Sequence, residues 1–146
     1  MAFLIRNVLL LLMVLVLVLF QTTCGWSFRK HRLTVTATND LGAEMTIHCK
    51  SKEDDLGSHL IPIKGKYEFS FRPNFWGTTQ FYCSFQWGTE FHYFDIYKGD
   101  RDHENCDSYK CIWSIIPKGP CMWNYLTGHY DICKDWNDSS LKSYAP

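Results

Sequence analysis

Residues 67–87 read YEFSFRPNFWGTTQFYCSFQW, and this stretch decides the fold. Apolar side chains occupy every second position on both sides of a turn signal at Pro73-Asn74. Alternation with period two is typical of a half-buried β-strand, because successive side chains point to opposite faces. The stretch therefore predicts two strands separated by a turn. The alternating apolar residues are Tyr67, Phe69 and Phe71, followed by Phe81, Cys83, Phe85 and Trp87.

The same alternation recurs on both sides of this stretch. It is found at residues 33–38, 44–50 and 111–115, and residues 121–125 are expected to form a last strand. Gly, Pro, Asn and Asp turn signals separate these runs, and residues 91–97 are aromatic on both faces. Short strands spaced by turns predict an all-β fold, a small disulfide-stabilised antiparallel β-sandwich of about six to eight strands. We assign it to residues 26–126, followed by a C-terminal extension at residues 127–146 that lacks strand alternation.

The N-terminus has a different composition from the rest of the chain. Arg6 is the only charged residue among residues 1–25, and Val8–Phe20 is an unbroken apolar run of 13 residues followed by small and polar residues. This pattern is typical of a secretory signal peptide. The run is shorter than the roughly 20 residues that span a bilayer, so we expect no stable membrane insertion after cleavage. We predict a signal peptide at residues 1–25, cut after Cys24 or Gly25, and a secreted, extracellular product.

Removal of the signal peptide changes the cysteine count from odd to even. Cys24 is lost, and six cysteines remain: Cys49, Cys83, Cys106, Cys111, Cys121 and Cys133. An even number in a secreted chain predicts a disulfide framework. Because Cys106 and Cys111 are close in sequence, we expect each to bond elsewhere. Cys83 is then expected to pair with Cys111 or Cys106, and Cys49 with Cys121 or Cys111, while Cys133 takes what remains.

Charge and motifs exclude several classes of function. The chain has 15 basic and 15 acidic side chains, and loss of Arg6 leaves 14 against 15, a net charge of −1. Nucleic-acid binding needs a basic excess, so we expect no such partner. No G-x-S-x-G elbow, phosphate-binding glycine loop or metal-ligand spacing is present, so we predict no enzyme, cofactor or metal. Zinc at His103, Cys106 and Cys111 and calcium at Glu53–Asp55 are weaker interpretations than disulfides and a structural turn.

Four stretches together carry a family resemblance. They are Val35–Leu41 (VTATNDL), Ile47–His59 (IHCKSKEDDLGSH), Tyr67–Trp87 and Phe94–Trp113 (FDIYKGDRDHENCDSYKCIW). This pattern resembles the plant self-incompatibility protein family, the stigmatic S-proteins and their homologues, from about Leu33 to Cys121. The resemblance implies a small secreted β-sandwich without known catalysis, some of whose members are ligands recognised by pollen. It also implies about four recurrent cysteines, so Cys133 departs from the pattern.

We therefore expect a monomeric protein ligand that binds a cell-surface receptor protein through its loops. The hydrophilic segment Lys98–Asp107 is the expected contact, because loops on a rigid scaffold are common sites of recognition. The alternative is a merely soluble connection between strands. The proposed contact residues are Lys98, Asp100, Arg101, Asp102, His103 and Glu104.

Aromatic richness supports a second interpretation, a secreted carbohydrate-binding module of the cell wall. Exposed rings that stack on sugars would be drawn from Trp76, Tyr93, Tyr97, Tyr125 and Tyr130. Phe75 and Trp76 are otherwise expected in the core, as are Trp87, Trp113 and Trp123. Asn137-Asp138-Ser139 is a glycosylation sequon, which makes Asn137 a candidate acceptor.

Overall fold

The computed structural model describes residues 1–23 and 31–137, in two units that are treated separately. The first contains helix α1 (Ala2–Thr23), which includes the apolar run of the predicted signal peptide. Within the described residues, no helix has the length and apolar character needed to cross a membrane. The two predicted cleavage positions, after Cys24 and after Gly25, lie outside the described residues.

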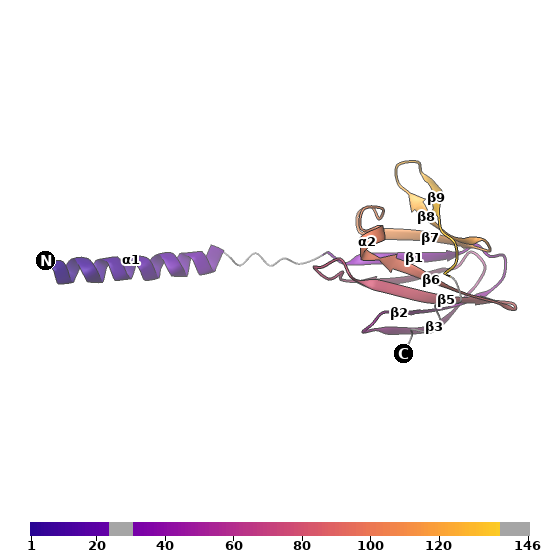
Figure 1. Ribbon diagram of the computed structural model, residues 1–146, viewed down its shortest axis with the longest axis horizontal. Coiled ribbons are helices and arrows are strands. Elements are labelled where there is room, and N and C mark those ends of the chain that lie inside the picture. The colour runs from indigo at the N-terminus through magenta and orange to yellow at the C-terminus, as the bar shows by residue number, and fades with distance from the viewer. Residues whose placement is uncertain (24–30, 138–146) are drawn as a thin grey trace. The chain divides into compact units, whose positions relative to one another are not determined.

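The second unit, from His31 onward, is a two-layered β-structure (Figure 1). A five-stranded sheet has the order β4-β1-β7-β8-β9, and a four-stranded sheet has the order β3-β2-β5-β6. The prediction of an all-β sandwich is confirmed, although the described residues form nine strands rather than six to eight. The strands are β1 (Leu33–Asn39), β2 (Met45–Lys50), β3 (Asp55–Ile61), β4 (Lys66–Phe71), β5 (Gln80–Trp87), β6 (Glu90–Lys98), β7 (Lys110–Ile116), β8 (Gly119–Asn124) and β9 (His129–Cys133).

The stretch that predicts the fold also connects its two layers. β4 belongs to the five-stranded sheet and β5 to the four-stranded sheet, and their aromatic side chains meet between the sheets. The ring centroid of Phe81 lies 5.0 Å from that of Phe69 and 4.5 Å from that of Phe71. Burial of each such ring stabilises the fold by about 1.5–3 kcal/mol. Fully buried residues that complete the core include Val35, Ile47, Phe85, Phe94, Ile96, Trp113 and Ile115.

Three features of the strands differ from the sequence prediction. β1 and β7 pair in parallel, whereas the prediction was purely antiparallel. Apolar alternation shows which face of a strand is buried but not which strand lies beside it. The sequence pattern therefore could not predict the parallel pairing of β1 with β7. β3 begins at Asp55, within the stretch Glu53–Asp55 where the sequence predicts a structural turn, and β9 lies within the predicted extension. Both are edge strands with mostly exposed side chains, so neither shows the apolar alternation of a half-buried strand.

The predicted disulfide pairings are wrong. Among the described residues the bonds join Cys49 to Cys83, Cys106 to Cys111 and Cys121 to Cys133. The first and third connect residues directly opposite each other on neighbouring strands of one sheet, not on different sheets. The second closes a tight turn, in which the Lys110 amide donates to the Asp107 carbonyl at 2.8 Å. Closeness in sequence therefore does not prevent this bond, because the turn brings the two cysteines together.

Candidate recognition surface

Two connecting segments meet at one end of the sandwich. The loop between β4 and β5 contacts the segment after β6, which begins with a short helix, α2 (Gly99–Asp102). A Cβ atom on Gly99 would lie 2.1 Å from the carbonyl oxygen of Gly77, so the backbones are closely packed. The Gly99 amide also donates to the Thr79 carbonyl at 2.9 Å. We name residues 73–79 and 98–107 together the recognition surface.

The β4–β5 loop exposes two large aromatic side chains. Phe75 is 82% exposed and Trp76 is 80% exposed, and their rings pack edge to face with centroids 5.4 Å apart. The expectation that these two residues lie in the core is wrong. They lie in the turn between β4 and β5, outside both sheets, so aromatic character alone did not decide their burial.

Asn74 holds this loop in a defined shape. Its backbone amide donates to Thr79 Oγ1 at 2.7 Å, and its side-chain amide donates to Thr78 Oγ1 at 2.7 Å. The Thr78 amide returns a bond to Asn74 Oδ1 at 2.9 Å. Gly77 has a φ of +68°, which glycine adopts without steric cost. The loop therefore presents its aromatic tip in an ordered conformation.

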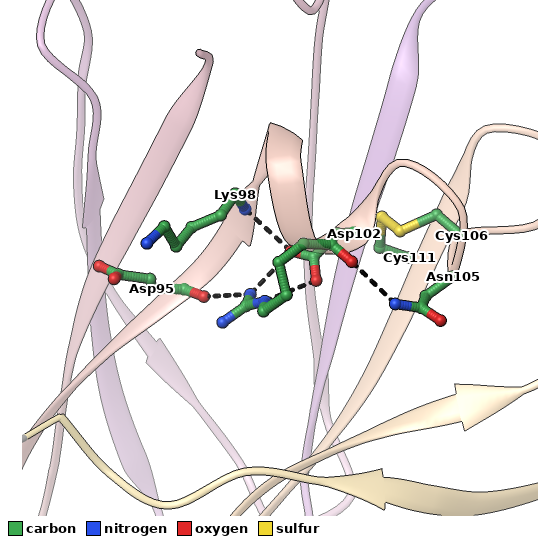
Figure 2. A network of polar contacts seen from close by, with 7 residues as sticks. Asp95, Lys98, Asp102, Asn105, Cys106 and Cys111 are labelled. Carbon is green, nitrogen blue, oxygen red and sulfur yellow. Dashed lines mark hydrogen bonds and ion pairs between the residues drawn. A yellow bond between two sulfur atoms is a disulfide. The ribbon is translucent and has the colours of Figure 1, made fainter. Parts of the chain in front are cut away.

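The second segment is organised around a buried ion pair (Figure 2). Arg101 donates to both carboxylate oxygens of Asp102, at 2.6 and 2.7 Å, and to the Asp95 carbonyl at 2.6 Å. The Lys98 amide donates to Asp102 Oδ2 at 2.8 Å. The guanidinium of Arg101 also lies over the rings of Phe94 and Trp113, with centroid distances of 5.0 and 5.5 Å. Such cation–π contacts add to the stability of a charge held beside the core.

This arrangement corrects part of the predicted contact set. Asp102 is fully buried, so it cannot touch a partner, and Arg101 is turned toward the interior by its internal bonds. Asp100, His103 and Glu104 are exposed, and Lys98 is half-buried. The sequence did not separate the structural charges from the exposed ones, because all six lie within one hydrophilic run.

The end of the segment is fixed as well. Asn105 donates through its side chain to the Arg101 carbonyl at 2.8 Å, and the Cys106 amide donates to the Asp102 carbonyl at 3.0 Å. The Cys106–Cys111 disulfide then ties this segment to β7. Figure 2 shows the disulfide beside the ion-pair network. The exposed charges thus stand on a rigid support.

Other candidates from the sequence are distributed over the second unit. Tyr97 is buried in the core, so it cannot stack on a sugar, whereas Tyr125 and Tyr130 belong to the β8–β9 hairpin. Trp113 is fully buried, as expected, but Trp87 and Trp123 are half-buried. Residues 1–23 and 31–137 hold no group of three or more side chains suited to a metal ion.

The glycosylation candidate lies at the end of the described chain. The Asn137 amide donates to the Tyr93 carbonyl at 2.8 Å, which places Asn137 against the edge of β6. Ser139, the third sequon residue, lies outside the described residues. Glycosylation of Asn137 stays a prediction.

Comparison with known proteins identifies the family. The family model of plant self-incompatibility protein S1 matches residues 34–136. S-protein homolog 5 of Arabidopsis thaliana is 54% identical over 88 residues, which cover 60% of this chain and 67% of the relative. S-protein homolog 2 of the same plant is 44% identical over 117 residues, which cover 77% and 73% respectively.

A solved structure supports the fold. It represents SPH (Self-Incompatibility Protein Homologue) proteins, described as small, highly stable, secreted proteins from plants, and matches with a TM-score of 0.53 at 18% identity. The match covers 77% of this chain and 100% of that chain. At this identity the likeness shows a shared fold alone. The family match and the relatives confirm the resemblance found in the sequence: this chain belongs to the plant self-incompatibility protein S1 family.

Proposed function

We propose that this protein is a secreted extracellular ligand whose recognition surface binds a cell-surface receptor protein in cell–cell recognition or signalling. The observation that carries the proposal is the placement of Trp76. A side chain that is 80% exposed stands on an ordered loop, directly beside a braced segment of exposed charges. Secretion is supported by the predicted signal peptide and by the description of the SPH proteins as secreted.

The chemistry of this surface fits a protein partner. Protein interfaces commonly place aromatic anchors at the centre and polar groups at the rim, and tryptophan is enriched among the residues that carry most of the binding energy. Here Phe75 and Trp76 supply the aromatic part, and Asp100, His103 and Glu104 supply the polar part. Because both loops are braced before binding, less conformational entropy is lost on association.

The signs of the exposed charges also bear on the partner. Lys98, Asp100 and Glu104 belong to the same short segment, so the segment mixes positive and negative groups. A mixed surface can match the charge pattern of one protein and reject others. It suits an anionic lipid surface poorly, because attraction to such lipids comes from clusters of basic residues.

The test uses fluorescently labelled protein secreted from plant cells and intact plant protoplasts as the binding surface. We expect saturable binding that protease treatment of the protoplasts abolishes. Trp76→Ser is expected to weaken it by about tenfold or more, the effect of losing an aromatic anchor. Leu60→Ser is the matched control, because Leu60 is also a large exposed apolar residue but lies on the edge strand β3.

Three outcomes would contradict the proposal. Binding that is unchanged in Trp76→Ser would show that the aromatic tip is not the anchor. Binding that survives protease treatment and is reproduced by protein-free lipid vesicles would show that the tip inserts into lipid instead of a receptor. Loss of binding in Leu60→Ser would equally remove the assignment to this surface.

A further inference from the structure

A second aromatic group lies on the β8–β9 hairpin, away from the recognition surface. Trp123 of β8 and Tyr130 of β9 are paired across the hairpin, and their ring centroids are 5.0 Å apart at an interplanar angle of 74°. Tyr130 is 40% exposed, and Trp123 is half-buried. Met122, the neighbour of Trp123, is buried in the core, so Trp123 lies on the outer face of the sheet. The expectation that Trp123 fills the core is therefore wrong.

Hydroxyl groups dominate the neighbouring part of this outer face. On β1, Val35 and Ala37 face the core, so Thr34, Thr36 and Thr38 face outward. The strand registers align Thr34 with Ser70 of β4 and Thr38 with Ser114 of β7. Ser114 is in turn paired with Cys121, so Thr38, Ser114 and the Cys121–Cys133 disulfide form a cross-strand row that reaches the hairpin. Ser114 and Cys121 are buried within this row, and the Thr34–Ser70 pair lies four residues away along β1.

The polar groups of β1 and β4 on this face are held in place, and the accessible ones keep capacity to bind. Thr36 Oγ1 donates to Glu68 Oε2 at 2.9 Å, and the hydroxyls of Thr34 and Ser70 are 2.9 Å apart. A hydroxyl has two acceptor lone pairs besides its one donor, and a carboxylate has several acceptor sites. Thr36 is buried, so the second carboxylate oxygen of the exposed Glu68 and the lone pairs of the half-buried Thr34 are the groups that can accept further hydrogen bonds.

We propose that this face binds an uncharged polysaccharide chain built from β-linked hexoses. A pyranose ring in such a chain has apolar C–H faces, which pack against aromatic rings, and a rim of hydroxyls, which donate to oxygen acceptors. Tyr130 and Trp123 supply the aromatic surfaces, and Glu68 and Thr34 supply the acceptors. The ligand is independent of the receptor proposed above, because the two surfaces share no residue.

Dimensions and charge favour this ligand class. Five strands spaced by about 4.8 Å form a face roughly 19 Å across, which is wider than one sugar ring and suits an extended chain. Lys66 and Glu68 are two residues apart on β4, so a positive and a negative side chain lie on the same face. The face therefore lacks the cluster of basic side chains that would attract a polyanion. The Cys121–Cys133 disulfide joins the two strands of the hairpin that carry Trp123 and Tyr130 and so prepares the site before binding.

The test probes the secreted protein with insoluble cellulose and with cellohexaose, and uses polygalacturonate as the charged comparison. We expect saturable binding to the neutral probes, weakened about tenfold by Tyr130→Ser and also by Glu68→Gln. Circular dichroism and the melting temperature verify that both variants are folded. Trp76→Ser is the matched control, and it should bind cellohexaose as the parent protein does while losing protoplast binding.

The outcomes separate this site from the receptor proposal. Absence of saturable binding to either neutral probe would overturn the carbohydrate site and leave the receptor proposal standing. Equal binding by Tyr130→Ser, or a preference for polygalacturonate, would overturn it as well. Loss of cellohexaose binding in Trp76→Ser would place the sugar on the recognition surface and overturn the assignment to the hairpin.

Discussion

The inter-sheet core and the recognition surface use the same kinds of residues in opposite ways. Phe71 packs between the sheets against Phe81 and Tyr97, whereas Trp76, five positions later, stands in solvent. Carboxylates differ in the same manner, since Asp102 is buried and Asp100 is exposed. In this chain, the position of the backbone relative to the two sheets decides burial, and residue type does not.

The largest expected difference between the two regions is in stability. Phe81→Ala should lower the free energy of unfolding by about 3–5 kcal/mol, because it leaves a cavity between the sheets. Trp76→Ser should change it by no more than about 0.5 kcal/mol, because the ring is mostly solvated in the folded state. Guanidinium unfolding of both variants measures this contrast. Similar losses in the two would show that the aromatic tip supports the fold.

The same contrast between buried and exposed positions explains which parts of the fold could be predicted from the sequence. Apolar alternation reports burial on one face of a strand, so it located β1, β2, β4, β5 and β7 and the all-β class. It carries no information on which strands are neighbours, and so missed the parallel β1–β7 pair. The disulfide between Cys106 and Cys111 depended on a turn whose residues, Ser108 and Tyr109, adopt positive φ without being glycine.

For the recognition surface, the sequence identified the charged segment but not the aromatic tip. The hydrophilic run from Lys98 to Asp107 was visible as composition, whereas its internal ion pair needed three-dimensional contacts with Asp95 and Phe94. Phe75 and Trp76 follow Pro73-Asn74 and precede Gly77, and this dense turn signal could have indicated exposure. The prediction that Phe75 and Trp76 lie in the core relied on their aromatic character and did not take this turn signal into account.

The second expected effect separates buried from exposed carboxylates within one segment. Asp102→Asn should reduce stability by about 3 kcal/mol, because Arg101 then keeps a charge beside the core without its partner. Asp100→Asn is the matched control and should stay within about 0.5 kcal/mol of the parent. Hydrogen exchange at residues 98–106 should accelerate in the first variant alone. Equal exchange in both would show that the ion pair does not brace this segment.

The third prediction concerns the contact between the two loops. Gly99→Ala places a methyl group against the Gly77 backbone and should lower stability by about 1–3 kcal/mol through overpacking. It should also weaken protoplast binding, because the aromatic tip is displaced from the charged segment. Gly128→Ala is the comparison, since a Cβ atom there would have nothing within 4 Å and only the positive φ of +71° opposes the change. Normal protoplast binding by Gly99→Ala would show that the two loops need not be aligned for recognition.

The smallest effect is expected at an exposed carboxylate outside both regions. Hydrogen bonds from His48 at 2.5 Å, the Gly57 amide at 3.0 Å and Lys50 at 2.9 Å hold the pKa of Asp55 well below its ordinary value. A carboxyl group with a lowered pKa in the folded state stabilises it fully above the unfolded pKa, near pH 4, and loses this contribution as the pH falls further. The difference in melting temperature between the parent and Asp55→Asn should therefore be constant above about pH 5 and shrink toward pH 2.

Salt should reduce the same difference in melting temperature, because the partners of Asp55 are partly solvated, whereas the loss of stability in Asp102→Asn should depend little on salt. A difference in melting temperature that widens on acidification would mean that the folded protein does not stabilise Asp55 as the anion. It would also contradict the contrast drawn between the solvated carboxylate of Asp55 and the buried carboxylate of Asp102.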